Sequence, residues 1–168
     1  MGLSNFRNPI NDRYFEDYHD GSVFEFGPIT LSEEDVIRFA KEFDPQAMHI
    51  DAEAAAVGPF KGLIASGWHT VSLMMRLFVD NYLTAVASLA SPGVDEVRWH
   101  KPVRPGDDIF LRVTILETRL SRSKLDRGMV TSLLEGINQV GETVASLKAM
   151  NLVGLRRPLP EDNMRVPQ

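Results

Sequence analysis

The chain has 168 residues, 18 Lys and Arg against 23 Asp and Glu, and no cysteine. A chain of this length is expected to form one domain that needs no disulfide or metal for stability. The absence of cysteine excludes disulfides, zinc ribbons, iron–sulfur ligation and a thiol nucleophile, and it fits a reducing, cytoplasmic location. The net charge of −5 argues against general binding to nucleic acid or to anionic membranes.

The first 21 residues mix Asn, Pro, Asp and aromatic residues without a period, which predicts an irregular N-terminal arm over residues 1–21. This segment has acidic residues and no continuous apolar core, so it does not resemble a secretory signal. Alternation around Val23 predicts a short strand at residues 22–26 that ends before Gly27-Pro28.

Helix signals follow this strand. Ser32 before three acidic residues is typical of a helix N-terminus, and apolar residues recur at helical spacing up to Phe43. Pro45 disfavours helical geometry at Asp44, so we expect the helix to end there and an irregular loop to follow. A second, short helix is expected over residues 52–57.

A long apolar stretch at residues 68–90 predicts one further helix. It is long enough to cross a bilayer, but His69, Arg76 and Asp80 would be costly in hydrocarbon. A helix that is buried on nearly all sides of a folded domain therefore fits the stretch better.

Strand patterns follow a predicted turn at Ser91-Pro92-Gly93. Several strands in succession with short turns form an antiparallel sheet, and a sheet around one long helix would cover the apolar faces. The expected domain covers residues 22–157 and is followed by a loose tail at 158–168. The predicted strands are residues 94–99, 108–118, 129–138 and 143–153.

Asp44 and His49 form the polar pair with the clearest chemical meaning. A carboxylate and an imidazole on one tight loop can reach the same water molecule and transfer protons near neutral pH. The structural alternative is an ordinary turn, in which the His binds a backbone carbonyl. Gly67 stands where the long helix begins, so its free N–H could bind a developing negative oxygen, although a helix-entry turn is the commoner use of Ser-Gly.

The residues around this pair resemble the MaoC-like family of (R)-specific enoyl-CoA hydratases and dehydratases. Asp44, Met48 and His49 match the Asp, the apolar residue and the His of that family's motif. Gln46 replaces the family's Asn, and Ala47 replaces its Pro.

Two further segments extend the resemblance to roughly residues 30–155. Gly67 falls at the family's oxyanion-binding glycine, and Ser66 replaces the usual His. Residues 97–107 resemble the strand and turn that follow the central helix in this family.

The resemblance implies an α+β hotdog fold, in which a curved antiparallel sheet wraps one long helix, and a homodimer or higher homo-oligomer. It implies reversible syn addition of water to a trans-2-enoyl-CoA, with Asp44 and His49 as a shared acid–base pair and the Gly67 N–H on the thioester carbonyl. No metal or other cofactor is implied, and neither a nucleic acid nor a membrane partner is expected. Further substrate-binding residues are expected at Gln46, Ser66, Trp68, Arg98, Lys101 and Arg104.

Two other functions stay open on the sequence. A hotdog thioesterase would need a carboxylate on the central helix, for which Asp80 is the candidate, although no nucleophile arrangement accompanies it. A non-catalytic acyl-CoA-binding module would not need to retain both Asp44 and His49. The acyl chain and the pathway stay open as well.

Overall fold

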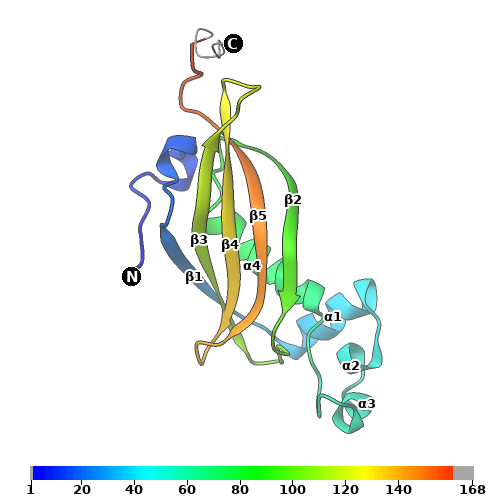
Figure 1. Cartoon of the computed structure of the whole chain (residues 1–168). Coiled ribbons are helices and arrows are strands. Elements are labelled where there is room, and N and C mark those ends of the chain that lie inside the picture. Colours follow the sequence, from blue (N-terminus) through cyan, green and yellow to red (C-terminus); the bar gives the residue numbers. More distant parts are fainter. Residues whose placement is uncertain (1, 161–168) are drawn as a thin grey trace.

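The computed structural model describes residues 2–160. Its strands are β1 (Val23–Thr30), β2 (Ser88–Trp99), β3 (Asp108–Leu120), β4 (Arg127–Asn138) and β5 (Thr143–Gly154). Its α-helices are α1 (Glu33–Phe43), α2 (Ala47–Ile50), α3 (Ala52–Val57) and α4 (Gly67–Asn81). The five strands form one curved antiparallel sheet in the order β1-β3-β4-β5-β2, which packs around α4 (Figure 1). The predicted α+β class, with a curved sheet and one central helix, is confirmed.

The core lies between the sheet and α4. Buried residues alternate with more exposed ones along β3 and β4, as expected of strands that turn one face to a core. Met74 and Phe78 of α4 are fully buried in the same cluster as Leu111 and Leu134 of the sheet. This packing fixes α4 against the sheet. Helices α1 to α3 lie near the N-terminus of α4, and the N-terminal arm lies near its C-terminus (Figure 1).

The central helix is shorter than the sequence predicts. It ends at Asn81, and residues 88–90, which were expected to be helical, begin β2 instead. The Arg13 guanidinium donates to the carbonyl oxygens of Asn81 and Tyr82 at 2.9 and 2.7 Å, which satisfies the end of the helix. Thr84 Oγ1 then accepts two backbone N–H bonds in the following turn. Because Arg13 is distant in sequence, helical periodicity could not reveal this end.

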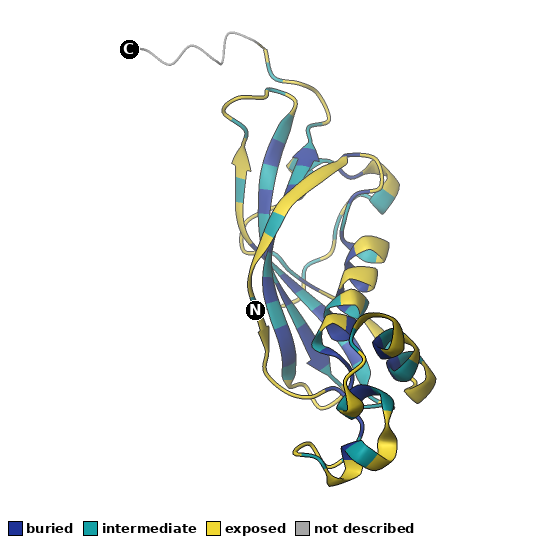
Figure 2. Ribbon diagram, turned by 90° about the vertical axis from the view of Figure 1, so that its right-hand side faces the viewer, coloured by how far each residue is buried: buried dark blue, intermediate teal, exposed yellow. Residues whose placement is uncertain are grey.

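The burial of α4 also differs from the prediction. Trp68, Met75 and Val79 are 57, 49 and 44% exposed, so the helix is not buried on nearly all sides (Figure 2). The sheet of a single chain covers one side of α4 and leaves these apolar side chains at the surface.

Two strands run through segments that the sequence predicts as turns. β1 continues through Gly27-Pro28 to Thr30, and β2 includes Ser91-Pro92-Gly93, each with a shift in register at that point. Both are edge strands, where a proline removes no hydrogen bond that the sheet needs. The other three strands agree with the prediction to within two residues.

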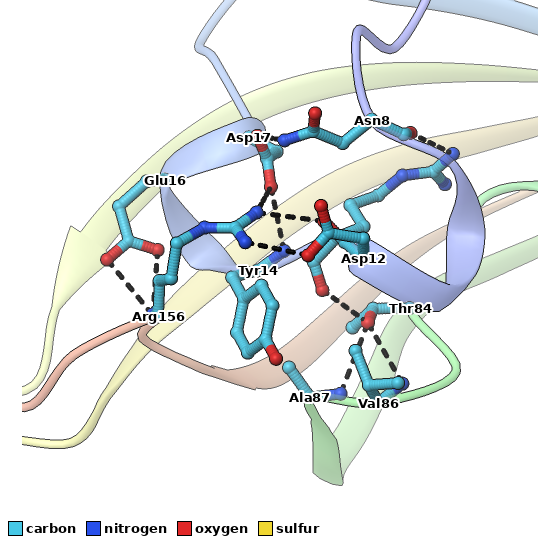
Figure 3. A network of polar contacts seen from close by, with 10 residues as sticks. Asn8, Asp12, Tyr14, Glu16, Asp17, Thr84, Val86, Ala87 and Arg156 are labelled. Atoms are coloured by element: carbon cyan, nitrogen blue, oxygen red, sulfur yellow. Dashed lines mark hydrogen bonds and ion pairs between the residues drawn. The ribbon is translucent and has the colours of Figure 1, made fainter.

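A polar network joins the N-terminal arm to the chain after β5 (Figure 3). The Arg156 side chain donates to Asp12 Oδ1 at 2.7 Å and stands over the Tyr14 ring at 4.4 Å from its centroid. The Arg156 backbone N–H donates to the carboxylate of Glu16 at 3.1 Å. The arm is therefore anchored to the sheet, and it contains the short 3-10 helices Ile10–Asp12 and Phe15–Asp17.

The domain boundaries at residues 22 and 157 stay predictions. Most of the tail expected at residues 158–168 lies outside the described residues. Within residues 2–160, no helix is long and apolar enough to cross a membrane.

Candidate active site

The end of α1 and the one-turn helix α2 position the Asp44–His49 pair. Ser32 caps the start of α1, as predicted, by accepting a hydrogen bond from the Asp35 N–H at 3.1 Å. At Asp44, directly before Pro45, the backbone leaves helical geometry, with φ −152° and ψ 68°. The segment expected to be an irregular loop contains α2, which carries His49.

The imidazole of His49 faces the carboxylate of Asp44. His49 Nε2 lies 3.5 Å from Asp44 Oδ2, and His49 Nδ1 lies 2.8 Å from the carbonyl oxygen of Ile64. A carbonyl oxygen only accepts, so Nδ1 carries the proton, and a neutral His49 leaves Nε2 free to accept one. His49 is buried, whereas the Asp44 side chain is 20% exposed. Solvent therefore reaches the pair mainly at Asp44.

Two neighbouring side chains donate to Asp44. Gln46 Nε2 donates to Oδ1 and Ser66 Oγ donates to Oδ2, each at 2.7 Å. These two hydrogen bonds, with a smaller contribution from His49, lower the pKa of Asp44 from its ordinary value, while partial burial opposes them. The carboxylate is therefore ionised at neutral pH and held in one orientation.

Ser66 also begins helix α4. Its Oγ accepts from the Trp68 N–H at 3.3 Å, and its side chain is fully buried. The N–H of Gly67, the first residue of the helix, has no acceptor within residues 2–160. A Cβ added to Gly67 would lie 2.3 Å from Trp99 Nε1, so glycine is what allows the indole this close.

These groups line one cavity of about 420 Å³, a size that suits a small-molecule ligand. Its lining includes Asp44, His49 and Gly67, which lie near the start of α4. Its apolar walls include Met48, Phe60, Ile64, Trp68, Trp99 and Val103. The cavity can therefore hold an apolar chain beside a carboxylate, an imidazole and Gly67, whose N–H has no acceptor within residues 2–160.

The structure brings several of the predicted residues to this cavity and leaves others outside it. Gln46, Trp68 and Lys101 line it beside Asp44, His49 and Gly67. Ser66 contacts Asp44 but has no exposed surface of its own. Lys101 also forms an ion pair with Glu142.

Two predicted basic residues do not line the cavity. Arg104 Nη2 donates to the carbonyl oxygen of Phe60 at 2.6 Å, which fixes the loop before α4. Arg98 donates to the carbonyl oxygen of Val97 at 2.9 Å.

Sequence analysis did not single out Trp99, although it lies in the segment 97–107 whose pattern matches the family. The signal that could have found it is an aromatic residue at the end of a strand that leads into this segment. Its contact with Gly67 joins the end of β2 to the start of α4, which local patterns do not show.

Two other kinds of site find no support at the cavity. Asp80, the candidate carboxylate of a thioesterase, pairs with Arg76 at 2.5 Å on an exposed part of α4 and does not line the cavity. Within residues 2–160, no group of three His, Asp or Glu side chains is placed to hold a metal ion.

Comparisons with known proteins identify related sequences and structures. The model of the MaoC like domain matches residues 17–135. The "Uncharacterized protein YdeM" of Bacillus subtilis is 36% identical over 124 residues, which are 74% of this chain and 86% of that protein. The "3-hydroxyacyl-thioester dehydratase Z" of Mycobacterium tuberculosis is 37% identical over 83 residues, which are 48% of this chain and 55% of that protein. The crystal structure of the MaoC-like dehydratase from Rhodospirillum rubrum has a TM-score of 0.79 and 38% identity, covering 88% of this chain and 99% of that one.

Proposed function

The chain belongs to the MaoC-like dehydratase family, and on this premise we propose that it hydrates trans-2-enoyl-CoA thioesters reversibly to (R)-3-hydroxyacyl-CoA. The observation that carries the proposal is the pair of Asp44 and His49, 3.5 Å apart in a cavity that Gly67 also lines, and the N–H of Gly67 has no acceptor within residues 2–160. A carboxylate, an imidazole and a backbone donor at one cavity are the groups that this reaction needs.

In the proposed mechanism, one water molecule in the cavity contacts both Asp44 and His49. His49 Nε2 can accept a proton, and the ionised Asp44 can accept the other hydrogen of the water. The pair removes a proton as the water oxygen attacks C3 of the enoyl group, and it returns a proton to C2. Because the water oxygen and the proton both add to the same face of the double bond, the addition is syn.

In this mechanism, Gly67 stabilises the negative charge that develops on the substrate. As water adds to C3, negative charge moves to the thioester carbonyl oxygen. A backbone N–H at the start of α4 would donate to that oxygen and stabilise the enolate-like transition state. These steps use side chains and backbone groups of this chain and require no metal or other cofactor.

Binding of the CoA portion is assigned to the basic residues near the cavity. Lys101 lines the cavity itself and is 47% exposed at its side chain, so its ammonium group can meet a phosphate. Arg98 is exposed on the neighbouring strand, whereas Arg104 holds the loop at Phe60. Lys101 and Arg98 are therefore the proposed phosphate contacts, and Arg104 is proposed to shape the cavity wall.

The proposed active form is a homodimer. β2 is an edge strand with exposed apolar residues, among them Leu89 and Val94, and α4 exposes Met75 and Val79. An exposed edge with apolar neighbours is a surface that a second copy can cover. Sedimentation of the purified protein tests this assignment, since a monomer at micromolar concentration would contradict it.

Product analysis tests the proposed reaction. The protein is incubated with trans-2-enoyl-CoAs of increasing chain length, and the products are separated by chiral chromatography while free thiol is measured in the same samples. We expect (R)-3-hydroxyacyl-CoA without thiol release. Release of free CoA would indicate a thioesterase instead, and binding without any product would indicate an acyl-CoA-binding module.

A further inference from the structure

Trp99, at the end of β2, lies directly against the start of α4. A Cβ placed on Gly67 would lie 2.3 Å from Nε1 of the indole, 2.5 Å from Cε2 and 2.7 Å from Cδ1. The pyrrole edge of the ring, which carries the indole N–H, is therefore the part of Trp99 that meets Gly67.

This contact places two N–H donors close together. A Cβ atom lies about 2.5 Å from the backbone nitrogen of its own residue, so the Gly67 nitrogen is less than about 5 Å from Trp99 Nε1. One oxygen atom at hydrogen-bond distance from both nitrogens, about 2.9 Å from each, is compatible with that separation. The separation of the two nitrogens therefore allows one acceptor to receive both bonds.

Both donors are available to a ligand. Within residues 2–160, neither the Gly67 N–H nor the Trp99 indole N–H donates to another protein group. Both residues line the cavity that contains Asp44 and His49. Trp99 is 48% exposed, and its ring is supported by an edge contact with Trp68 at 5.2 Å between centroids.

We propose that the Trp99 indole N–H is a second donor to the thioester carbonyl oxygen, beside the Gly67 N–H, so that Trp99 is a catalytic residue. This inference rests on the proposed hydratase function and names the group that completes its oxyanion site. The carbonyl oxygen is the acceptor in the substrate that gains negative charge during addition, so a second donor there stabilises the transition state more than the ground state.

Kinetics of Trp99→Phe give the first readout. Phenylalanine keeps an aromatic ring on Gly67 and removes the N–H. Loss of one oxyanion donor lowers kcat by about 10²-fold or more, whereas loss of packing alone would mainly raise KM. We expect kcat to fall about a hundredfold with a smaller change in KM. An unchanged kcat would overturn the inference.

Nuclear magnetic resonance gives a readout that a purely structural role would not move. The chain has two tryptophans, so its indole N–H region contains two signals, which the Trp68→Phe and Trp99→Phe variants assign. The ligands are butyryl-CoA, which has the carbonyl but no double bond to hydrate, and S-butyl-CoA, a thioether without the carbonyl. Dodecanoyl-CoA and its thioether repeat the pair for a long chain. We expect a downfield shift of the Trp99 indole proton with each thioester and none with its thioether.

The outcomes separate this inference from the proposed function. If a thioester binds and shifts the Gly67 amide but not the Trp99 indole, the inference is wrong and the proposed function stands. Equal indole shifts with thioester and thioether would also overturn it, because the shift would not depend on the carbonyl. If none of these CoA compounds binds, both the proposed function and the inference fail.

Discussion

The two ends of helix α4 differ in whether their terminal backbone groups have hydrogen-bond partners within the protein. At the C-terminal end, Arg13 donates to the carbonyl oxygens of Asn81 and Tyr82, and the Tyr18 hydroxyl donates to the Tyr82 oxygen as well. At the N-terminal end, Gly67 lines a cavity, and its N–H has no acceptor within residues 2–160. We call the C-terminal end, whose carbonyl oxygens have donors within the protein, the closed end of α4. We call the N-terminal end, where the Gly67 N–H has no acceptor within residues 2–160, the open end.

This difference separates a part of the molecule that maintains the fold from the part that is proposed to perform chemistry. Burial of polar backbone groups is costly unless they are paired, so the closed end contributes to stability. An unpaired donor beside an ionised Asp44 and a buried His49 has no comparable structural use. Substitutions at the closed end are therefore expected to change stability, and those at the open end to change activity.

The largest effect is expected for His49→Gln. Glutamine can still donate to the Ile64 carbonyl but cannot accept and return a proton as imidazole does, so kcat should fall by about 10²–10⁴-fold. The double variant with Asp44→Asn should fall little further, because the two residues act as one unit. Steady-state hydration assays measure both variants, with the exposed His19→Gln as a matched control. If the fold-losses in kcat of the two single variants multiplied in the double variant, a shared acid–base role of Asp44 and His49 would be contradicted.

Arg13→Met should produce the largest loss of stability. Methionine keeps an apolar stem against Phe6 but leaves the helix carbonyls without their donor, at a cost of about 2–4 kcal/mol. Urea unfolding measures the change, and kcat per folded molecule should stay near the wild-type value. Arg7→Met, an exposed change in the same arm, should alter stability by less than about 0.5 kcal/mol. Equal effects of the two substitutions would show that Arg13 does not close the helix.

Ser66→Ala, at the open end of α4, should have an intermediate effect on activity. Without its hydroxyl, Asp44 loses one of the donors that lower its pKa, so that pKa should rise. The acid side of the pH–rate profile should then move to higher pH, and kcat at its plateau should fall about tenfold, as Asp44 is less well oriented. Ser72→Ala, on an exposed part of α4, is the control. An unmoved acid limb would contradict the positioning of Asp44 by Ser66.

The smallest effect concerns stability in acid. Because folding lowers the pKa of Asp44, its carboxylate contributes stability that is fully present above its unfolded pKa of about 3.9. That contribution is lost as the pH falls through the folded pKa. The difference in unfolding free energy between wild type and Asp44→Asn should therefore shrink between about pH 5 and pH 2. A difference that does not change with pH would contradict the lowered pKa.

The parts of the fold that local pattern determines were predictable from sequence. The start of α1 follows from Ser32 and the acids behind it, and its end from Pro45. The alternating strands β3, β4 and β5 were predicted to within two residues. The end of α4 was not, because Arg13 satisfies its carbonyl oxygens from 68 and 69 residues away.

The candidate site divides in the same way. Asp44 and His49 are close in sequence, so their common loop could be inferred, and the structure places them 3.5 Å apart. The hydrogen bond from Ser66 to Asp44 and the contact of Trp99 with Gly67 join separate elements. Spacing along the chain carries no information on such contacts, and only the folded arrangement shows them.

The most direct test of the account is the loss of enoyl-thioester absorbance with crotonyl-CoA and longer trans-2-enoyl-CoAs. Wild type and Asp44→Asn are measured side by side, with a free-thiol assay on the same samples. The account predicts turnover by the wild type without thiol release, and at least about a hundredfold slower turnover by the variant. Equal turnover by the two proteins, or thiol release that matches the absorbance loss, would contradict it.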